Sequence, residues 1–219
     1  MPLAVPGPAV LAGTVLDVPT DEWRILPREV VAHPEAADGS RREVRLYAGD
    51  GLPRRVVRRR FTLAWFHVRS LRQTLEWLFA ASGPYDLVLW REEYPSWPGT
   101  GGRTEFSLPN GWRLALDTAP AAAPPGGTYT PRVRVGMAGA DLAYVSQDTA
   151  TYEAGAPAVG EVWFETGGSR FKLAAPPAVG ETVHAALVPT YRVYHSGELA
   201  EKRLTGPIRE PEELVLLEA

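Results

Sequence analysis

The side chains most capable of metal or nucleophilic chemistry are few in this sequence. Cysteine is absent, which excludes disulfides, thiolate metal ligands and a cysteine nucleophile together. The four histidines have neither the spacing of a zinc site nor the helical pair of a metalloprotease; they are His33, His67, His184 and His195. We therefore expect no metal site, no cofactor and no catalytic residues.

Two adjacent glutamates, Glu92 and Glu93, follow an apolar run and precede the aromatic residues Tyr94 and Trp97. A glycosidase places two carboxylates across one sugar. Neighbouring residues of a strand point to opposite faces, however, so these two glutamates would not face one substrate. Exposed aromatic residues mark recognition surfaces, including surfaces for carbohydrate. The pattern therefore favours binding over hydrolysis.

Glycine and arginine clusters give little support for nucleotide or nucleic-acid binding. Gly99, Gly101 and Gly102 precede a strand and not a helix N-terminus, so they do not form a phosphate-binding loop. The arginines between residues 54 and 60 divide between two strand faces, and the chain carries a net charge of -3. A solvated or salt-bridged subunit surface explains them better. Its candidate residues are Arg54, Arg55, Arg58, Arg59 and Arg60.

These side chains must be positioned by two strands and one helix. Residues 54–68 predict a long strand that is partly apolar on both faces, so we expect it to be sandwiched. Ser70 and Gln73 form the capping-box pattern of a helix over residues 70–81, which Gly83 and Pro84 end. Residues 85–90 return as a short apolar strand. The helix is expected to cover the sheet that these strands build.

Length and composition describe a globular protein. The chain has 219 residues, 45% of them hydrophobic, and seven tryptophans, which is sufficient for a sizeable core. No apolar run approaches the roughly 20 residues that span a bilayer, and the first residues lack the pattern of a secretion signal. We therefore expect a soluble, unprocessed protein.

Beyond residue 103 the pattern is one of short strands. Residues 104–108 and 112–116 flank the turn Pro109-Asn110-Gly111 and predict a hairpin. Further strands, with no helix among them, are expected at 132–137, 141–146, 161–166, 171–174 and 182–194. The pentapeptide Pro-Ala-Val-Gly-Glu at 157–161 and again at 177–181 is interpreted as a reused turn. The apolar end, residues 211–218, predicts a terminal strand or one helical turn that packs on the body of the protein.

The predicted fold is mainly β with one covering helix. Residues 1–40 are expected to form an N-terminal arm or edge strands. Residues 41–103, with 188–219 returning, are expected to form a β-sandwich-like domain, and residues 104–187 a second small β domain.

Three successive elements carry a family pattern. A strand of the form R-x-F-x-L-x-W precedes a helix ending in F-x-x-x-G and an apolar strand ending in an aromatic residue. The positions are Arg59, Phe61, Leu63, Trp65, Phe79, Gly83, Leu89 and Trp90. This order resembles the N-terminal domain of phage distal tail proteins and related minor tail proteins. A T-x-F-x-L segment at 104–108 and a turn after 171–174 extend the resemblance more weakly, over most of residues 41–195.

The resemblance implies a structural virion protein and not an enzyme. It would be a distal tail or tail-hub ring subunit, with residues 41–103 forming the ring and six copies closing it. Such a ring joins the tail tube protein to the proteins of the tail tip and leaves a central channel through which DNA passes. The expected location is the tail tip of the virion, after assembly in the host cytoplasm, with no membrane partner.

Two other functions stay open at this point, a tail tube or tail terminator protein and a carbohydrate-binding β-sandwich module in host adsorption. A ring needs two complementary patches on each subunit, and the arginine cluster and the loop of Tyr94 and Trp97 are the candidates. We expect Trp97 to anchor a contact between subunits, because interfaces favour tryptophan. The alternative is that Trp97 folds back as a lid on its own domain.

Overall fold

The computed structural model describes residues 8–19, 23–29, 57–64, 84–119, 129–195, 200–203 and 209–219. This part of the chain consists mostly of strands in three sheets, with two short α-helices, so the prediction of a mainly β protein is confirmed. The helix expected over residues 70–81 lies outside the described residues. In the described ranges, no helix has the length and apolar character needed to cross a membrane.

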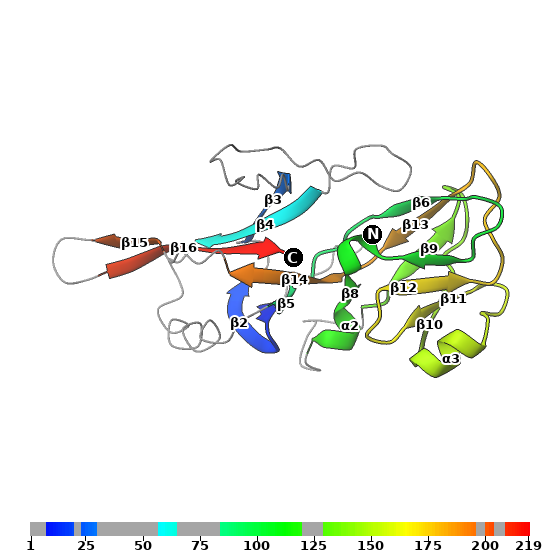
Figure 1. The fold of residues 1–219 in the computed structure, drawn as a ribbon, viewed down its shortest axis with the longest axis horizontal. Helices are drawn as coiled ribbons and strands as arrows, with labels where there is room; N and C mark the ends of the chain where they lie inside the picture. The colour runs from blue at the N-terminus through cyan, green and yellow to red at the C-terminus, as the bar shows by residue number, and fades with distance from the viewer. Residues whose placement is uncertain are drawn as a thin grey trace, which may run out of the picture.

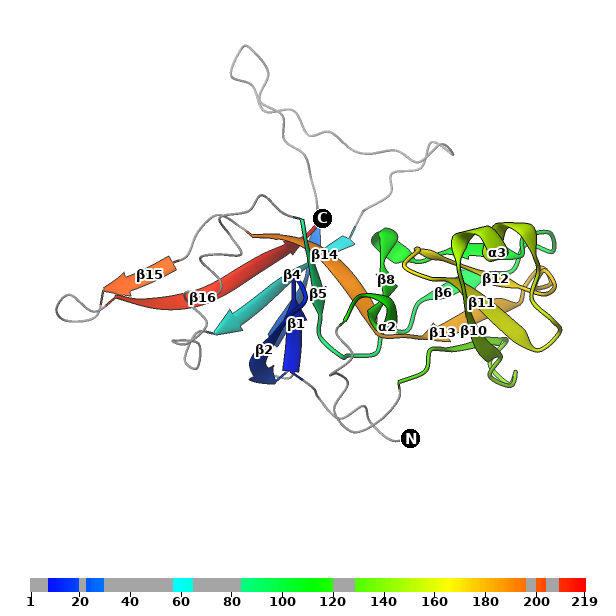
Figure 2. The ribbon, with the colours of Figure 1, turned by 90° about the horizontal axis from the view of Figure 1, so that it is seen from below.

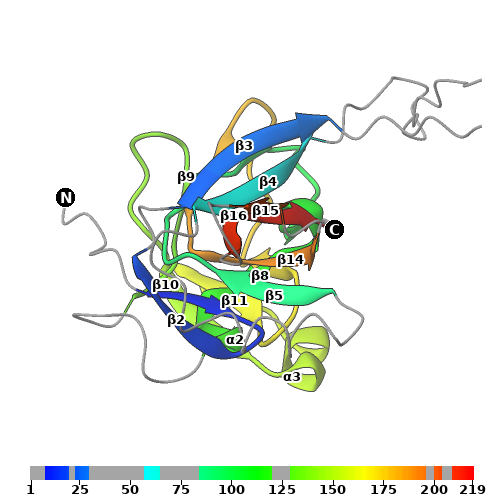
Figure 3. The ribbon, with the colours of Figure 1, turned by 90° about the vertical axis from the view of Figure 1, so that its left-hand side faces the viewer.

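The largest sheet is antiparallel and has nine strands, which draw on both ends of the chain. Its main path runs in the order β2-β1-β5-β14-β16-β4-β3, with β15 beside β16 and β8 beside β14 (Figures 1 and 3). The strands are β1 (Pro8–Leu11), β2 (Thr14–Pro19), β3 (Trp23–Glu29), β4 (Val57–Ala64), β5 (Tyr85–Val88), β8 (Arg113–Leu114), β14 (Pro189–His195), β15 (Ala200–Arg203) and β16 (Arg209–Glu218).

The apolar end of the chain forms β16, a strand and not a helical turn. Leu216 lies opposite Phe61 of β4, and Leu217 lies opposite Tyr194 of β14. Leu214 and Leu216 are buried, because this strand has a neighbour on each side. The last strand is therefore an inner strand of the sheet, while β15 and the start of β16 project at the end of the molecule (Figure 2).

The strand β4 agrees with the sandwiched strand that the sequence predicts. Phe61 and Thr62 point to opposite faces, and both are buried. Phe61 packs against Tyr191 of β14, with ring centres 4.7 Å apart. A strand with apolar residues in both rows is thus covered on both faces at these two positions.

Two smaller sheets face each other beside the large one, and we call this pair the sandwich (Figure 1). The four-stranded sheet has the order β10-β11-β12-β7, and the three-stranded sheet the order β6-β13-β9. Their strands are β6 (Ser96–Pro98), β7 (Glu105–Ser107), β9 (Arg132–Val135), β10 (Ala143–Gln147), β11 (Glu161–Glu165), β12 (Arg170–Leu173) and β13 (Thr182–Ala186). β6 lies before residue 104, where we expected the second domain to begin, yet it pairs within the sandwich.

The hairpin expected on either side of Pro109-Asn110-Gly111 is wrong. The turn itself closes as its residues suggest, because the Trp112 amide donates to the Pro109 carbonyl and Asn110 adopts a positive φ of 49°. The flanking strands nevertheless separate: β7 pairs with β12, and β8 pairs with β14 of the large sheet. Phe106 and Leu114 are each buried in a different sheet, and that burial outweighs the local pairing signal.

Two helices appear where only strands were expected, α2 (Ala115–Thr118) and α3 (Thr149–Ala154). Asp148 caps α3, since its carboxylate accepts a hydrogen bond from the Thr151 amide at 2.9 Å. The crossover through α3 lets β10 and β11 run parallel, which a tight turn could not do. Both helices are shorter than two turns, so their apolar periodicity is too brief to recognise.

The strand expected over residues 182–194 is two strands, β13 and β14, in different sheets. Leu187 and Val188 lie between them and are buried. The apolar run of the sequence continues through the break, from Ala185 to Val188, so no turn residue marks a boundary between the two strands. The chain passes from the sandwich into the large sheet at this point.

The repeated pentapeptide forms the same turn twice, as the sequence suggests. In each copy the glutamate side chain accepts a hydrogen bond from the alanine amide, Glu161 from Ala158 and Glu181 from Ala178. The glycine of each copy has a positive φ near 90°. The valines at the tips are the most exposed large apolar residues of the described chain, Val159 at 96% and Val179 at 81%.

Candidate subunit-contact surface

Arg59 is one of the arginines predicted to contact another subunit, but its side chain is engaged inside the protein. Its guanidinium donates hydrogen bonds to the Tyr191 hydroxyl at 3.0 Å and to a Glu93 carboxylate oxygen at 2.9 Å. The guanidinium carbon also lies 4.6 Å from the ring centre of Trp112. These contacts hold Arg59 against its own core.

Glu218 completes this arrangement from the end of the chain. Its carboxylate is buried, with the residue 4% exposed, and accepts hydrogen bonds from the Arg59 amide at 2.8 Å and from the Trp112 indole at 2.7 Å. The side-chain amide of Asn110 donates a further hydrogen bond to this carboxylate at 3.2 Å. Burial of the carboxylate is tolerated because several donors meet it. We call Arg59, Glu93, Asn110, Trp112, Tyr191 and Glu218 the Arg59 network.

Tyr191 lies at the centre of the Arg59 network and donates to Glu93 at 3.0 Å. Burial, reinforced by the negative charge of Glu93, raises the pKa of the Tyr191 hydroxyl well above its usual range. The hydroxyl therefore stays protonated and acts as a donor. Since Tyr191 is only 1% exposed, it is closed to a substrate and serves to join β4 with β14.

The other arginines of the cluster are placed differently. Arg60 follows Arg59 in β4 and is exposed, as the alternation of a strand requires. Arg58 lies in the same strand, opposite Arg28 of β3. Arg54 and Arg55 lie outside the described residues. Of the five predicted contact arginines, Arg60 is thus the one whose described side chain faces solvent.

The loop of residues 94–102 is more ordered than its prolines and glycines suggested, since it contains β6. Two glycines allow close backbone contact with the turn at 177–181. A Cβ at Gly99 would lie 2.3 Å from the Ala178 carbonyl oxygen, and Gly101 has a φ of +76°. Their amides donate to the carbonyls of Glu181 and Pro177. The loop is therefore bound to the sandwich along its length.

Trp97 packs on the core of its own sandwich. Its ring centre lies 4.9 Å from that of Phe171 and 6.2 Å from that of Phe106, both in edge-on geometry. Its indole donates to the Ser107 carbonyl at 3.0 Å. These contacts link β6 of one sheet to β7 of the other, which is the lid arrangement; a role between subunits stays a prediction.

Tyr94 is turned the other way and is 67% exposed. Its hydroxyl donates to Glu92 at 2.8 Å, and this hydrogen bond, with smaller contributions from burial and the Glu92 charge, raises the pKa of Tyr94. Glu92 in turn accepts two bonds from the guanidinium of Arg132, at 3.0 and 3.1 Å. Glu92 contacts Tyr94 and Arg132, whereas Glu93 contacts Arg59 and Tyr191, so the two glutamates point in different directions, as the sequence predicted.

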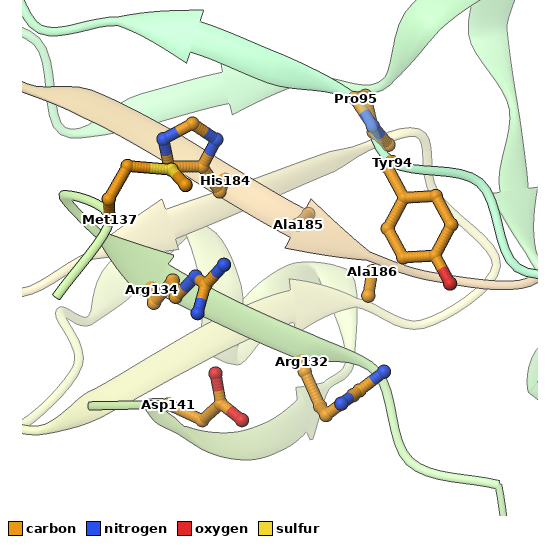
Figure 4. Close-up of a pocket in the computed structure, with 9 residues that line it drawn as sticks. All are labelled: Tyr94, Pro95, Arg132, Arg134, Met137, Asp141, His184, Ala185 and Ala186. Atoms are coloured by element: carbon orange, nitrogen blue, oxygen red, sulfur yellow. The ribbon is translucent and has the colours of Figure 1, made fainter. Parts of the chain in front are cut away.

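A depression of about 230 Å³ lies beside Tyr94, on the outer side of β9 and β13 (Figure 4). Its lining comprises Tyr94, Pro95, Arg132, Arg134, Met137, Asp141, His184, Ala185 and Ala186. Arg132, Arg134 and His184 come from alternate strand positions, while Val133 and Val183 between them are buried in the core. The depression is thus a feature of one sheet face.

Sequence reasoning found Tyr94 but not the side chains that surround it. Arg132 and Arg134 alternate with valines in Arg-Val-Arg-Val, which is a signal for an outward basic row. His184 joins that row only because β13 pairs with β9. Glu218 has no local signal, because its partners lie more than 100 residues away.

Within the described ranges, no three histidine, aspartate or glutamate side chains form a group that could hold a metal ion. Comparison with protein-family models, with curated proteins and with solved structures finds no match to this chain.

Proposed function

We propose that the chain is a structural subunit of a ring in the tail of a phage, a distal tail or tail-hub protein. The ring would join the tail tube to the tail tip, leave a central channel for DNA, and reach the virion after assembly in the host cytoplasm. The support from the sequence is the order of strand, helix and strand around Arg59, Phe61 and Trp90.

The observation that carries the proposal is the open form of the large sheet. Among the described strands, β2 and β3 end its path at opposite edges, and each has one strand neighbour. A head-to-tail ring needs two different patches on every subunit, and two such edges provide them. Each edge strand contains a proline, Pro19 or Pro27, which limits uncontrolled strand addition.

The position of Arg60 adds a second support. β3 covers one side of β4, and Arg60 lies exposed on β4. Arginine is enriched at protein interfaces, where its planar group pairs with carboxylates. Arg60 is therefore the residue of the predicted contact set that we assign to the ring contact.

The test measures particle mass against concentration for the purified chain. We expect a closed ring, with six copies as the leading number, and Arg60→Glu should weaken its assembly about tenfold or more through charge reversal. Arg103→Glu, at an exposed position of the sandwich, is the matched control and should leave assembly unchanged. A monomer at all concentrations contradicts the proposal, and open helical polymers favour a tail tube protein instead.

A further inference from the structure

The depression beside Tyr94 holds an arginine without an internal partner. Arg134 has no hydrogen bond or ion pair of its side chain within the described part of the chain, whereas Arg132 is engaged by Glu92. Arg134 lies directly opposite His184 in the pairing of β9 with β13. Asp141 is the one acidic residue of the lining. The centre of the depression therefore offers an unpaired guanidinium beside an imidazole (Figure 4).

Two exposed side chains stand at the ends of this basic row. Tyr94 lies at one end; its hydroxyl donates to Glu92, and the residue is 67% exposed. Met137, 73% exposed, lies near His184 at the other end (Figure 4). An exposed aromatic ring and an unpaired guanidinium in one depression suit a ligand that has both an apolar face and a negative group.

The floor of the depression limits the kind of ligand. The depression lies on the face of a sheet whose central strand, β13, pairs with β6 on one side and with β9 on the other, so the main chain of β13 is not available to an added peptide strand. A ligand on this face is recognised mainly by side chains. The volume of about 230 Å³ is below the range of drug-sized pockets, roughly 300–1,000 Å³, and has room for about one ring.

We propose that this depression binds a carboxylate-bearing sugar unit, with Arg134 pairing with the carboxylate and the Tyr94 ring covering an apolar face of the sugar. Arg132, Met137 and His184 complete the contact. Trp97 takes no part, since its ring packs inward. The inference does not rest on ring formation, because it uses only the residues that line the depression.

The test is ligand-observed NMR with a galacturonate trimer as the probe and a neutral galactose trimer as the comparison. We expect binding of the acidic trimer that weakens with added salt, because the ion pair is exposed and screened. Arg134→Gln and Tyr94→Ala should each lower the affinity about tenfold, the scale of one charged hydrogen bond or one aromatic contact. Arg192→Gln removes the same charge from an exposed position of β14 and should not change it.

Three results would overturn the inference, provided that circular dichroism shows each variant folded. One is no detectable binding of the acidic trimer at millimolar concentration. Another is binding of the neutral trimer with the same affinity, which would show that Arg134 does not recognise a carboxylate. The third is equal binding of a glutamate trimer peptide with the same dependence on Arg134, which would make the depression a site for acidic protein segments.

Discussion

The large sheet gathers strands from three distant parts of the chain, β1 to β4 near its start, β5 and β8 in its middle and β14 to β16 at its end, whereas the strands of the sandwich all lie between residues 96 and 186. The sheet joins its distant strands through the Arg59 network, in which the buried carboxylate of Glu218 meets several donors. The sandwich is filled by aromatic rings, with Phe106, Phe164 and Phe171 stacked at centre distances of 5.2 and 5.3 Å. Both regions share one apolar core, and the large sheet adds to it directional polar contacts that centre on a buried carboxylate and join segments far apart in sequence.

This difference suits the two regions to different tasks. Hydrogen bonds to a buried carboxylate fix relative position, because they weaken steeply when the geometry changes. In the ring that we propose, β2 and β3, which end the path of the described strands, would be the edges that meet neighbouring copies. In the sandwich, Trp97 and the hydrogen bond from the Leu142 amide to the Val133 carbonyl link the two sheets. The outer face of β9 and β13 carries the side chains that line the depression beside Tyr94.

The most severe test of the comparison is Glu218→Ala. The substitution leaves the Trp112 indole and the Arg59 amide without their acceptor, and each lost partner of this kind costs about 1–3 kcal/mol. We expect the free energy of unfolding to fall by about 2–4 kcal/mol in urea titrations on this basis. Glu218→Gln keeps the shape and one acceptor and should cost less.

Hydrogen exchange locates the effect of Glu218→Ala. Amide protection should fall in β4, β14 and β16 first, and the sandwich should keep most of its protection. Equal loss in both regions would mean that the Arg59 network does not distinguish them. A loss of stability below about 0.5 kcal/mol, typical of a surface change, would remove the network as the link between the strands.

The second test is Trp97→Ala in the sandwich. Full removal of a buried tryptophan costs about 3–5 kcal/mol, and Trp97 is half-buried, so we expect a loss of about 2–3 kcal/mol. Trp97→Phe retains an aromatic ring against Phe171 and should cost about 1 kcal/mol, the value of the lost indole hydrogen bond.

Particle mass measured on the same variant separates the two roles of Trp97. As a lid, Trp97→Ala lowers the stability of the subunit and leaves assembly normal wherever the chain is folded. As a subunit anchor, it weakens assembly while the unfolding midpoint of the monomer stays unchanged. The contacts with Phe106 and Phe171 lead us to expect the first outcome.

The smallest effect concerns Asp148 and pH. Hydrogen bonds from the Thr151 amide and hydroxyl lower the pKa of this carboxyl below its usual 3.8. Its contribution is fully present above that value and is lost as pH falls through the lower pKa of the folded state. The stability difference between wild type and Asp148→Asn should thus shrink below about pH 4, since asparagine does not titrate. A stability difference between the two proteins that stays constant down to about pH 2 would contradict this prediction.

The sequence alone determined that the fold is mainly β, and it determined much of the local structure. Alternating and apolar runs predicted strands at β4, β5, β9, β11 and β12 within a few residues. The absence of cysteine excludes disulfides, thiolate metal ligands and a cysteine nucleophile. The repeated pentapeptide predicted one turn used twice, because its glycine and glutamate act within five residues. Such features depend on neighbours in the chain, which a sequence displays directly.

Only the tertiary structure decided which strands pair and which way the site residues face. β7 and β8 flank one turn yet join different sheets, and the Arg59 guanidinium points inward because Glu93 and Tyr191 accept its hydrogen bonds there. Trp97 and Tyr94 stand three residues apart and share the same aromatic character, but one fills a core and the other borders a surface depression. Burial against distant segments makes these choices, and its free energy exceeds the local preferences that a sequence pattern records.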